Sequence, residues 1–245
     1  MRNKLSYIFV GLTLSASLMT SCGQQKHKGG RTDTYSSGVI SFASDESFSP
    51  IIEEEKQIFE SIYTKATVKP IYTNELDAIN MLLKEKVCLA ITSRDFKANE
   101  LKNLQERRFM PRAMKIAYDG LALIVNKENT DTCISVNDIR RILNGQVKNW
   151  GDIYHDSKRG EILLVFDNKK SSAVHFVEDS ILGGKPIQNK NVAATNKTAD
   201  VIKYVENTPN AIGIIGSNWL NDKRDSTNLT FNKKIRIMSV SKLPK

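Results

Sequence analysis

The sequence predicts an α/β protein with two lobes, each built from a mostly parallel sheet flanked by helices. Short apolar runs typical of strands alternate along the chain with segments of helical periodicity, as in parallel βαβ units. The chain has 245 residues, which exceeds the commonest size of a single domain, and its hydrophobic content of 40% suits a globular core.

Residues 1–21 have the pattern of a signal peptide and are set apart from the fold. Arg2 and Lys4 precede an apolar stretch at 7–19, which is too short to span a bilayer comfortably. Met-Thr-Ser then comes directly before Cys22, and this order resembles the cleavage site of bacterial lipoproteins. We therefore expect Cys22 to be lipidated, and the alternative is an ordinary signal peptide with a chance cysteine.

Residues 22–37 are polar and contain few apolar side chains, which is typical of a flexible tether. Removal of the signal peptide would lower the formal net charge of +9 by two, since Arg2 and Lys4 would be lost. The remaining positive charge favours an anionic ligand or an anionic membrane surface through long-range steering. It does not indicate nucleic acid, because no basic motif interleaved with aromatic residues accompanies it.

Five segments beyond the tether have apolar residues at helical spacing. Ser49 is a suitable N-cap for the first helix, Asn74 for the second and Ser135 for the third, which Gly145 ends. The expected helices cover residues 51–62, 76–83, 136–143, 174–181 and 201–205. The expected strands cover residues 39–44, 68–73, 89–92, 121–125, 162–166, 211–215 and 235–240.

Two segments are candidates for passing from one lobe to the other. The first is a long extended run through Asp119-Gly120, and the second is the apolar run at 211–216. Two crossings would build the first lobe from both ends of the chain. The resulting prediction places residues 38–120 and 216–245 in the first lobe and residues 121–215 in the second.

Four of the expected strands end in a small polar cluster that begins a helix. These clusters lie at 45–50, 74–77, 93–96 and 167–172. Ligands of open α/β sheets collect beyond the carboxyl ends of the strands, where free N–H groups at helix starts attract anions. The loops together therefore predict a site for one small anion, although each polar residue alone is also an ordinary helix cap.

Three segments in order resemble the phosphate-binding protein of bacterial ABC phosphate importers, a periplasmic substrate-binding protein of the type II two-lobe fold. DGLALIVNKEN at 119–129 is similar to its interlobe strand, ISVNDIRRILNGQVKNWGDI at 134–153 to a stretch of its second lobe, and TPNAIGIIGSNWL at 208–220 to its return crossing. The resemblance covers most of the chain from Val39 onward. It implies a periplasmic-binding-protein-like fold, inorganic phosphate held between the lobes, and an ABC permease as partner.

The candidate ligand-binding residues lie at strand ends, at helix starts and at the first crossing. By position, Ser47-Phe48 matches the family's Thr-Phe pair, Thr92-Ser93 its Ser-Asp pair and Ser171-Ser172 its Ser-Gly pair. The full set is Ser47, Phe48, Thr73, Asn74, Thr92, Ser93, Arg94, Asp119, Asp167, Ser171 and Ser172.

Several of these candidates have alternative roles. Asp167 stands where the resembling family commonly has an arginine, and it could accept a proton from phosphate or pair with Arg94, Lys169 or Lys170. Arg94 could clamp an oxyanion with its planar fork, or could pair with Asp95 or Glu100. Asp119 could simply shape the turn before Gly120.

Catalysis, cofactors and metals are not expected. Ser171, His175 and Asp167 have triad residue types, but they share one helix face, and no GxSxG or metal-binding motif occurs. Cys88 and Cys133 are expected to be unbridged, because a bridge between lobes would obstruct closure. A monomer is expected, and the alternatives to phosphate transport are another oxyanion or small anionic metabolite, or a lipoprotein that senses ligand or binds a partner.

Overall fold

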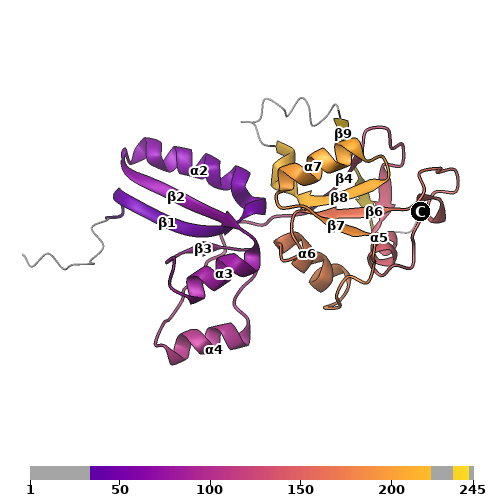
Figure 1. Ribbon diagram of the computed structural model, residues 1–245. Coiled ribbons are helices and arrows are strands. Elements are labelled where there is room, and N and C mark those ends of the chain that lie inside the picture. Colours follow the sequence, from indigo (N-terminus) through magenta and orange to yellow (C-terminus); the bar gives the residue numbers. More distant parts are fainter. Residues whose placement is uncertain (1–33, 222–233, 243–245) are drawn as a thin grey trace, which may run out of the picture.

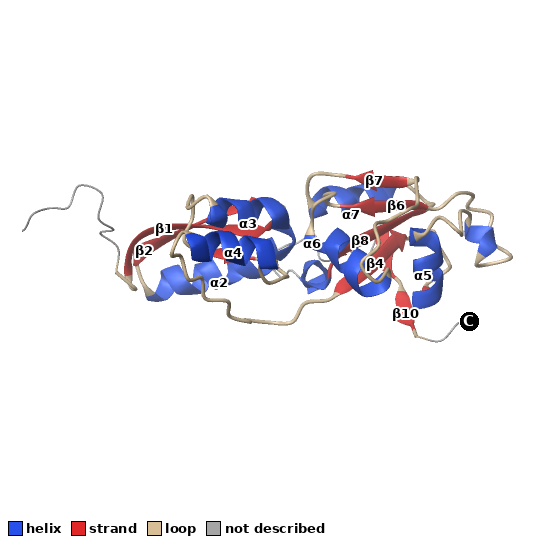
Figure 2. Ribbon diagram, turned by 90° about the horizontal axis from the view of Figure 1, so that it is seen from below, coloured by secondary structure: helices blue, strands red, loops and turns tan. Residues whose placement is uncertain are grey.

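The computed structural model describes residues 34–221 and 234–242, which form two lobes joined by an extended segment (Figure 1). Residues 109–120 contain neither helix nor strand and run from the end of lobe 1 to the first strand of lobe 2 (Figure 2). The first crossing expected at Asp119-Gly120 therefore lies where one lobe gives way to the other.

Lobe 1 contains a three-stranded parallel sheet in the order β2-β1-β3, with helices packed on it. Its strands are β1 (Ser37–Asp45), β2 (Lys65–Thr73) and β3 (Ala90–Ile91). Its helices are the short η1 (Glu46–Phe48), α2 (Ser49–Ile62), α3 (Glu75–Leu83) and α4 (Ala98–Glu106). All three strands point the same way, so their carboxyl ends meet at the edge that faces lobe 2.

Lobe 2 contains a five-stranded mixed sheet in the order β7-β6-β8-β4-β9, and a separate pair, β5 and β10. The strands are β4 (Leu121–Asn126), β5 (Cys133–Ser135), β6 (Leu163–Phe166), β7 (Val192–Ala194), β8 (Ala211–Gly216), β9 (Ile235–Ile237) and β10 (Ser239–Ser241). The helices are α5 (Val136–Leu143), α6 (Ser172–Phe176) and α7 (Thr198–Asn207). Two 3-10 helices, η2 (Trp150–Asp152) and η4 (Ser217–Asn221), and the π-helix η3 (Val177–Ile181), which continues α6, complete the lobe.

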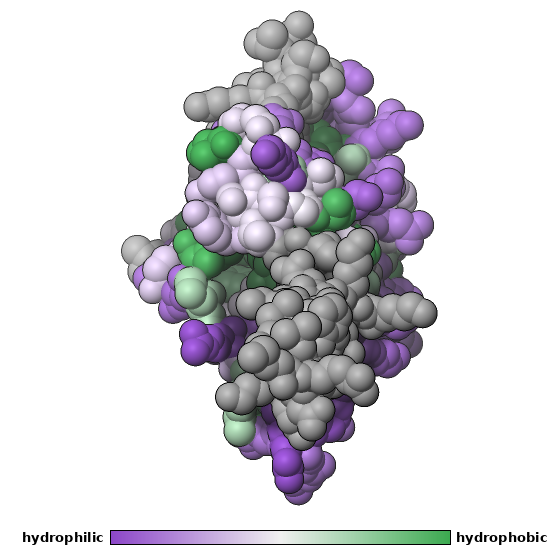
Figure 3. Space-filling view, turned by 90° about the vertical axis from the view of Figure 1, so that its left-hand side faces the viewer, coloured by the Kyte–Doolittle hydropathy of each residue, from purple (hydrophilic) through white to green (hydrophobic). Residues whose placement is uncertain are grey.

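The two lobes differ in how well they are packed. Lobe 2 has two clusters of buried apolar residues that include the fully buried Trp150 and Phe166. The corresponding cluster of lobe 1 has only three buried members, Ala43, Ala78 and Val87. The surface of lobe 1 has separate apolar residues among hydrophilic ones (Figure 3). Lobe 1 should therefore be the less stable part of the molecule.

Four of the five predicted helices correspond to α2, α3, α5 and α7, and the helix predicted at 174–181 divides into α6 and the π-helix η3. Helix α4 and strands β5 and β7 were not predicted, because α4 has few apolar residues and the two strands are only three residues long. The single strand predicted at 235–240 is interrupted at the buried Met238 and divides into β9 and β10.

The predicted placement of the C-terminal segment in lobe 1 is wrong for residues 234–242. Strand β9 pairs antiparallel with β4, and β10 pairs parallel with β5, so this segment belongs to lobe 2. Pairing there buries Met238 and Ile235 in the two apolar clusters of lobe 2. The second predicted crossing, β8, lies inside the lobe 2 sheet, and its last residue and the following η4 approach lobe 1 at Ser47.

Cys88 and Cys133 are not bridged to each other, as predicted. Cys88 is exposed and precedes β3 in lobe 1, whereas Cys133 begins β5 in lobe 2. Within the described ranges no helix is long and apolar enough to cross a membrane. The predicted signal peptide and the lipidation of Cys22 lie outside the described residues and stay predictions.

Candidate functional site

The predicted anion-binding loops of the two lobes contact each other directly. The hydroxyl oxygens of Ser47 and Ser172 lie 3.0 Å apart, although the two residues are 125 positions apart in the sequence. Both residues are buried. The indole Nε1 of Trp219 donates a hydrogen bond of 3.0 Å to the carbonyl oxygen of Ser47. The polar loops at the strand ends of lobe 1 therefore form part of the interlobe contact.

The centre of this contact is the carboxylate of Asp45, the last residue of β1. Its Oδ1 accepts a hydrogen bond from the backbone N–H of Ser47, and its Oδ2 accepts one from the backbone N–H of Ser172, both at 3.0 Å. Asp45 is fully buried, and this burial raises the pKa of its carboxyl group against the lowering effect of the two hydrogen bonds. One carboxylate thus receives amide donors from both lobes.

A second carboxylate of lobe 1 binds the start of a lobe 2 helix. Glu46 Oε2 accepts hydrogen bonds from the backbone N–H of Thr198 at 3.1 Å and from its hydroxyl at 2.8 Å. Thr198 is the first residue of α7. Burial raises the pKa of Glu46, while the bonds from Thr198 lower it. Neither Asp45 nor Glu46 was among the predicted site residues, although both lie in the polar cluster at 45–50.

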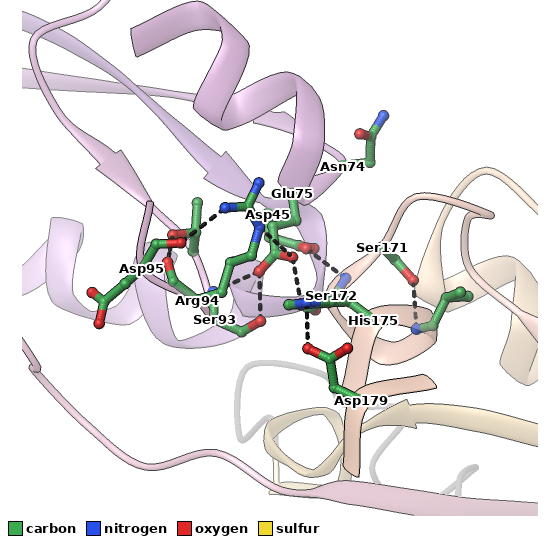
Figure 4. A network of polar contacts seen from close by, with 12 residues as sticks. Asp45, Asn74, Glu75, Ser93, Arg94, Asp95, Ser171, Ser172, His175 and Asp179 are labelled. Atoms are coloured by element: carbon green, nitrogen blue, oxygen red, sulfur yellow. Dashed lines mark hydrogen bonds and ion pairs between the residues drawn. The ribbon is translucent and has the colours of Figure 1, made fainter. Parts of the chain in front are cut away.

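A third buried carboxylate, Glu75, joins α3 to α6 across the interface (Figure 4). Its Oε1 accepts hydrogen bonds from the backbone N–H of Ser93 at 2.9 Å and from the hydroxyl at 2.5 Å. Its Oε2 lies 3.1 Å from His175 Nδ1, and the other ring nitrogen of His175 lies 2.8 Å from Asp179. His175 is therefore engaged by acidic partners, and the triad arrangement with Ser171 and Asp167 is not formed.

Arg94 takes the ion-pair alternative that the sequence left open. Its two terminal nitrogens donate to the carboxylate of Glu100 at 2.8 and 2.9 Å, and one of them also donates to the carbonyl oxygen of Asp95. The hydrogen bonds from Arg94 lower the pKa of Glu100. The guanidinium fork is thus occupied by lobe 1 itself rather than presented as a free clamp.

Asp167, at the end of β6, is the most unusual of the predicted residues. It is 5% exposed, and its Oδ1 has no hydrogen-bond partner among the described residues. Burial raises the pKa of Asp167 to about 6, helped by the negative charge of Asp45 and opposed by a hydrogen bond with Ser171. Within the described residues no ion pair connects it to Lys169, Lys170 or Arg94.

The other predicted residues serve local structure. Asn74 Oδ1 caps α3 by accepting from the N–H of Asp77, and Ser171 Oγ caps α6 by accepting from the N–H of Val174. The hydroxyl of Thr92 donates to the carbonyl oxygen of Arg94. Asp119 accepts hydrogen bonds from Gly120 N–H and from the Ser217 hydroxyl, which ties the first crossing to the turn after β8. Thr73 lies beside Asp45 in the β1–β2 register, and Phe48 is half-buried at the end of η1.

The interlobe region is therefore rich in buried acidic groups. Asp45, Glu46, Glu75 and Asp167 are all largely buried there, while the nearby Arg94 is neutralised by Glu100. In the described part of the chain, no group of three or more His, Cys, Asp and Glu side chains has the arrangement of a metal site. These carboxylates instead accept hydrogen bonds from backbone N–H groups and hydroxyls, which are the donors that oxyanions use.

Comparison with known proteins agrees with this architecture. Residues 28–244 match the family model described as the PBP superfamily domain, and the chain belongs to this family. The phosphate-binding protein PstS of Staphylococcus aureus (strain USA300) is 24% identical over 220 residues, which cover 89% of this chain and 66% of that protein. The PstS of Staphylococcus haemolyticus is 23% identical over 177 residues, which cover 72% of this chain and 55% of that protein.

The same fold occurs in a structure from Clostridium perfringens that is assigned as a phosphate ABC transporter substrate-binding protein and holds phosphate. Its TM-score with this chain is 0.67 at 18% identity, and the match covers 84% of this chain and 77% of that one. The two-lobe α/β fold predicted from the sequence is thereby confirmed. The chain spans 55% and 66% of the lengths of the two staphylococcal relatives.

Proposed function

We propose that this protein is an extracytoplasmic substrate-binding protein that holds inorganic phosphate between its lobes and delivers it to an ABC importer. The observation that carries the proposal is the pair of amide donors from opposite lobes, Ser47 and Ser172, on the two oxygens of Asp45. A carboxylate is itself an oxyanion, so these donors are suited to the oxygen atoms of phosphate.

Binding at this position would couple the ligand to lobe closure. Ser47 belongs to lobe 1 and Ser172 to lobe 2, so an anion that contacts both holds the two lobes together. A ligand shifts the balance between open and closed forms only through better contacts in one of them. The converging donors are such contacts, because they are brought together only when the lobes meet.

The names of the staphylococcal relatives support phosphate as the ligand. Another oxyanion or a small anionic metabolite is the second candidate, and one observation favours it. Asp167 stands where the phosphate-binding family commonly has an arginine, and it is buried with no ion pair to any of the described residues. The ligand of this chain therefore has to be tested against a panel of anions.

The predicted signal peptide and Cys22 support a location outside the cytoplasm with a lipid anchor, and the proposed role requires no catalysis. The polar tether at 22–37 would let the lobes reach a permease in the same membrane. A non-transport lipoprotein that senses the ligand would share these features, and dependence of phosphate uptake on the gene product separates the two roles.

Titration calorimetry tests the ligand. The mature chain with Cys22→Ser, which avoids lipidation, is titrated with phosphate, sulfate and molybdate. Trp219 offers a second readout, because its indole bonds to Ser47 across the lobe contact and its fluorescence should change on closure. We expect saturable binding of one phosphate per chain. Absence of binding for all three anions would contradict the proposed function.

A further inference from the structure

The two amide donors assigned to the anion already have an acceptor in this structure. Ser47 N–H and Ser172 N–H each donate to Asp45 at 3.0 Å, and the Asp45 side chain is fully buried. Each donor can serve only one strong acceptor at this distance. An anion can therefore occupy the same position only if the Asp45 carboxylate gives up these two hydrogen bonds.

The charge around this position opposes the entry of a further anion. The titratable groups that face Asp45 are Glu46 from η1, Glu75 from α3 and Asp167 after β6. The basic groups nearby are Lys197, which precedes α7, and His175 of α6, which Glu75 and Asp179 engage. Arg94 is already neutralised by Glu100. The charged groups around Asp45 are therefore mainly acidic.

A second observation indicates that the buried acidic groups near Asp45 have too few hydrogen-bond donors. The Oδ1 atom of Asp167 is buried without any hydrogen-bond donor among the described residues. A buried carboxylate oxygen without a donor is costly, and a proton on the carboxyl group removes that cost. Protons from solvent are thus the available means of reducing negative charge at the interface.

We propose that Asp45 is a built-in competitor of the anion, and that anion binding displaces its carboxylate and is coupled to uptake of a proton by Asp45. This inference rests on the proposed function, since it requires that the site take an oxyanion. The proton comes from solvent and forms an O–H bond on the displaced carboxyl group, and no other bond changes. The neutral carboxyl group can then donate a hydrogen bond to the anion instead of repelling it.

The direction of the pH effect follows from this exchange. Burial already raises the pKa of Asp45, so the proton is easier to add than on an exposed aspartate. Because binding takes up a proton, affinity should increase as pH falls, by up to about tenfold per pH unit for one coupled proton. A neutral residue at position 45 should remove this component and strengthen binding at high pH.

The test compares phosphate affinity at pH 6, 7 and 8 for the mature Cys22→Ser chain alone and with Asp45→Asn, Asp45→Ser or Glu55→Gln. Glu55 is an exposed acid on α2 and serves as the control for the loss of one negative charge. At each pH the protonation of phosphate is the same for every variant, so its contribution cancels when variants are compared at that pH. We expect the neutral variants at position 45 to bind phosphate about tenfold or more tightly at pH 8, with a flatter pH profile, and Glu55→Gln to follow the parent.

Two results would overturn the inference. If the parent binds phosphate and both Asp45 variants bind equally well or less well at pH 8 with an unchanged pH slope, Asp45 is not a competitor, and the proposed function stands. If neither the parent nor any variant binds phosphate, both the inference and the proposed function fail. Binding by the Asp45 variants alone would support the inference. Circular dichroism and thermal melts check the fold, and Asp45→Ser supplies a second neutral side chain if Asp45→Asn does not fold.

Discussion

The buried carboxyl group of Asp167 should make the protein less stable at neutral pH than at mildly acidic pH. Burial raises the pKa of Asp167 from the ordinary value of 3.8 to about 6. The folded state therefore binds a proton more readily than the unfolded state between these two values. Stability contributed by this group is complete below about pH 4 and is lost as the pH rises through about 6.

The magnitude follows from the size of this difference. About two pKa units correspond to about 3 kcal/mol of unfavourable free energy at pH 7, when the carboxylate is charged in both states. The Asp167→Asn variant is neutral at every pH and should avoid this cost. Its amide group also has to find hydrogen-bond partners, so we expect a net gain of about 1–3 kcal/mol at pH 7. The gain should vanish near pH 4.

Urea unfolding of parent and variant at pH 4.5, 6 and 7.5 measures these differences by linear extrapolation. Asp156→Asn is the matched control, because Asp156 is exposed in the same lobe and its replacement should change stability by less than about 0.5 kcal/mol. An Asp167→Asn variant that is equally stable or less stable than the parent at pH 7.5 would refute the reasoning. A gain of the same size at pH 4.5 would also refute it, since it would not depend on charge.

Three further predictions concern packing, an ion pair and the anchor. Arg94→Ala should lower the free energy of unfolding by about 1.5–3 kcal/mol in urea titrations, because it leaves the largely buried carboxylate of Glu100 without its bidentate ion-pair partner. An unchanged urea midpoint would contradict this prediction. Gly213→Ala should cost about 1–3 kcal/mol, since a Cβ there would lie 2.8 Å from the Ile124 side chain, and thermal melts should show a lower midpoint than the parent. Cys22→Ser should abolish labelling by a fatty-acid analogue in cells, and equal labelling of variant and parent would exclude lipidation at this residue.

Local signals in the sequence were sufficient for most elements of the fold. Asn74 and Ser135 were predicted as N-caps, and each accepts a hydrogen bond from the backbone N–H three residues later. The predicted N-cap Ser49 is instead the first residue of α2, which has Phe48 at its N-cap and no side-chain cap. Helix α4 was missed because its surface position leaves it with only one buried residue, Leu104. Caps and amphipathic periodicity are local properties, so they can be recognised without knowledge of the partner surface.

The candidate site was only partly predictable for the same reason. The joint position of Ser47 and Ser172 followed from two strand ends that each begin a helix, and their hydroxyls do meet. Asp45 and Glu46 were overlooked, because an acidic residue at a helix start is ordinarily explained by the helix dipole. Their partners, Ser172 and Thr198, are 127 and 152 residues away, and only lobe contact brings them together.

The sequence alone was enough to predict the two-lobe α/β class and the positions of most strands and helices, because strand–helix alternation and capping depend on neighbouring residues. The lobe to which the C-terminal strand β9 belongs depends on which sheet edge is free, and that edge belongs to β4, more than a hundred residues earlier. The position of the Asp45 carboxylate between the N–H groups of Ser47 and Ser172 likewise depends on contact between the two lobes. Long-range pairing and burial therefore determined the C-terminal topology and the acidic character of the site. Neither strand pairing nor burial between lobes can be predicted from residues that are neighbours in the sequence.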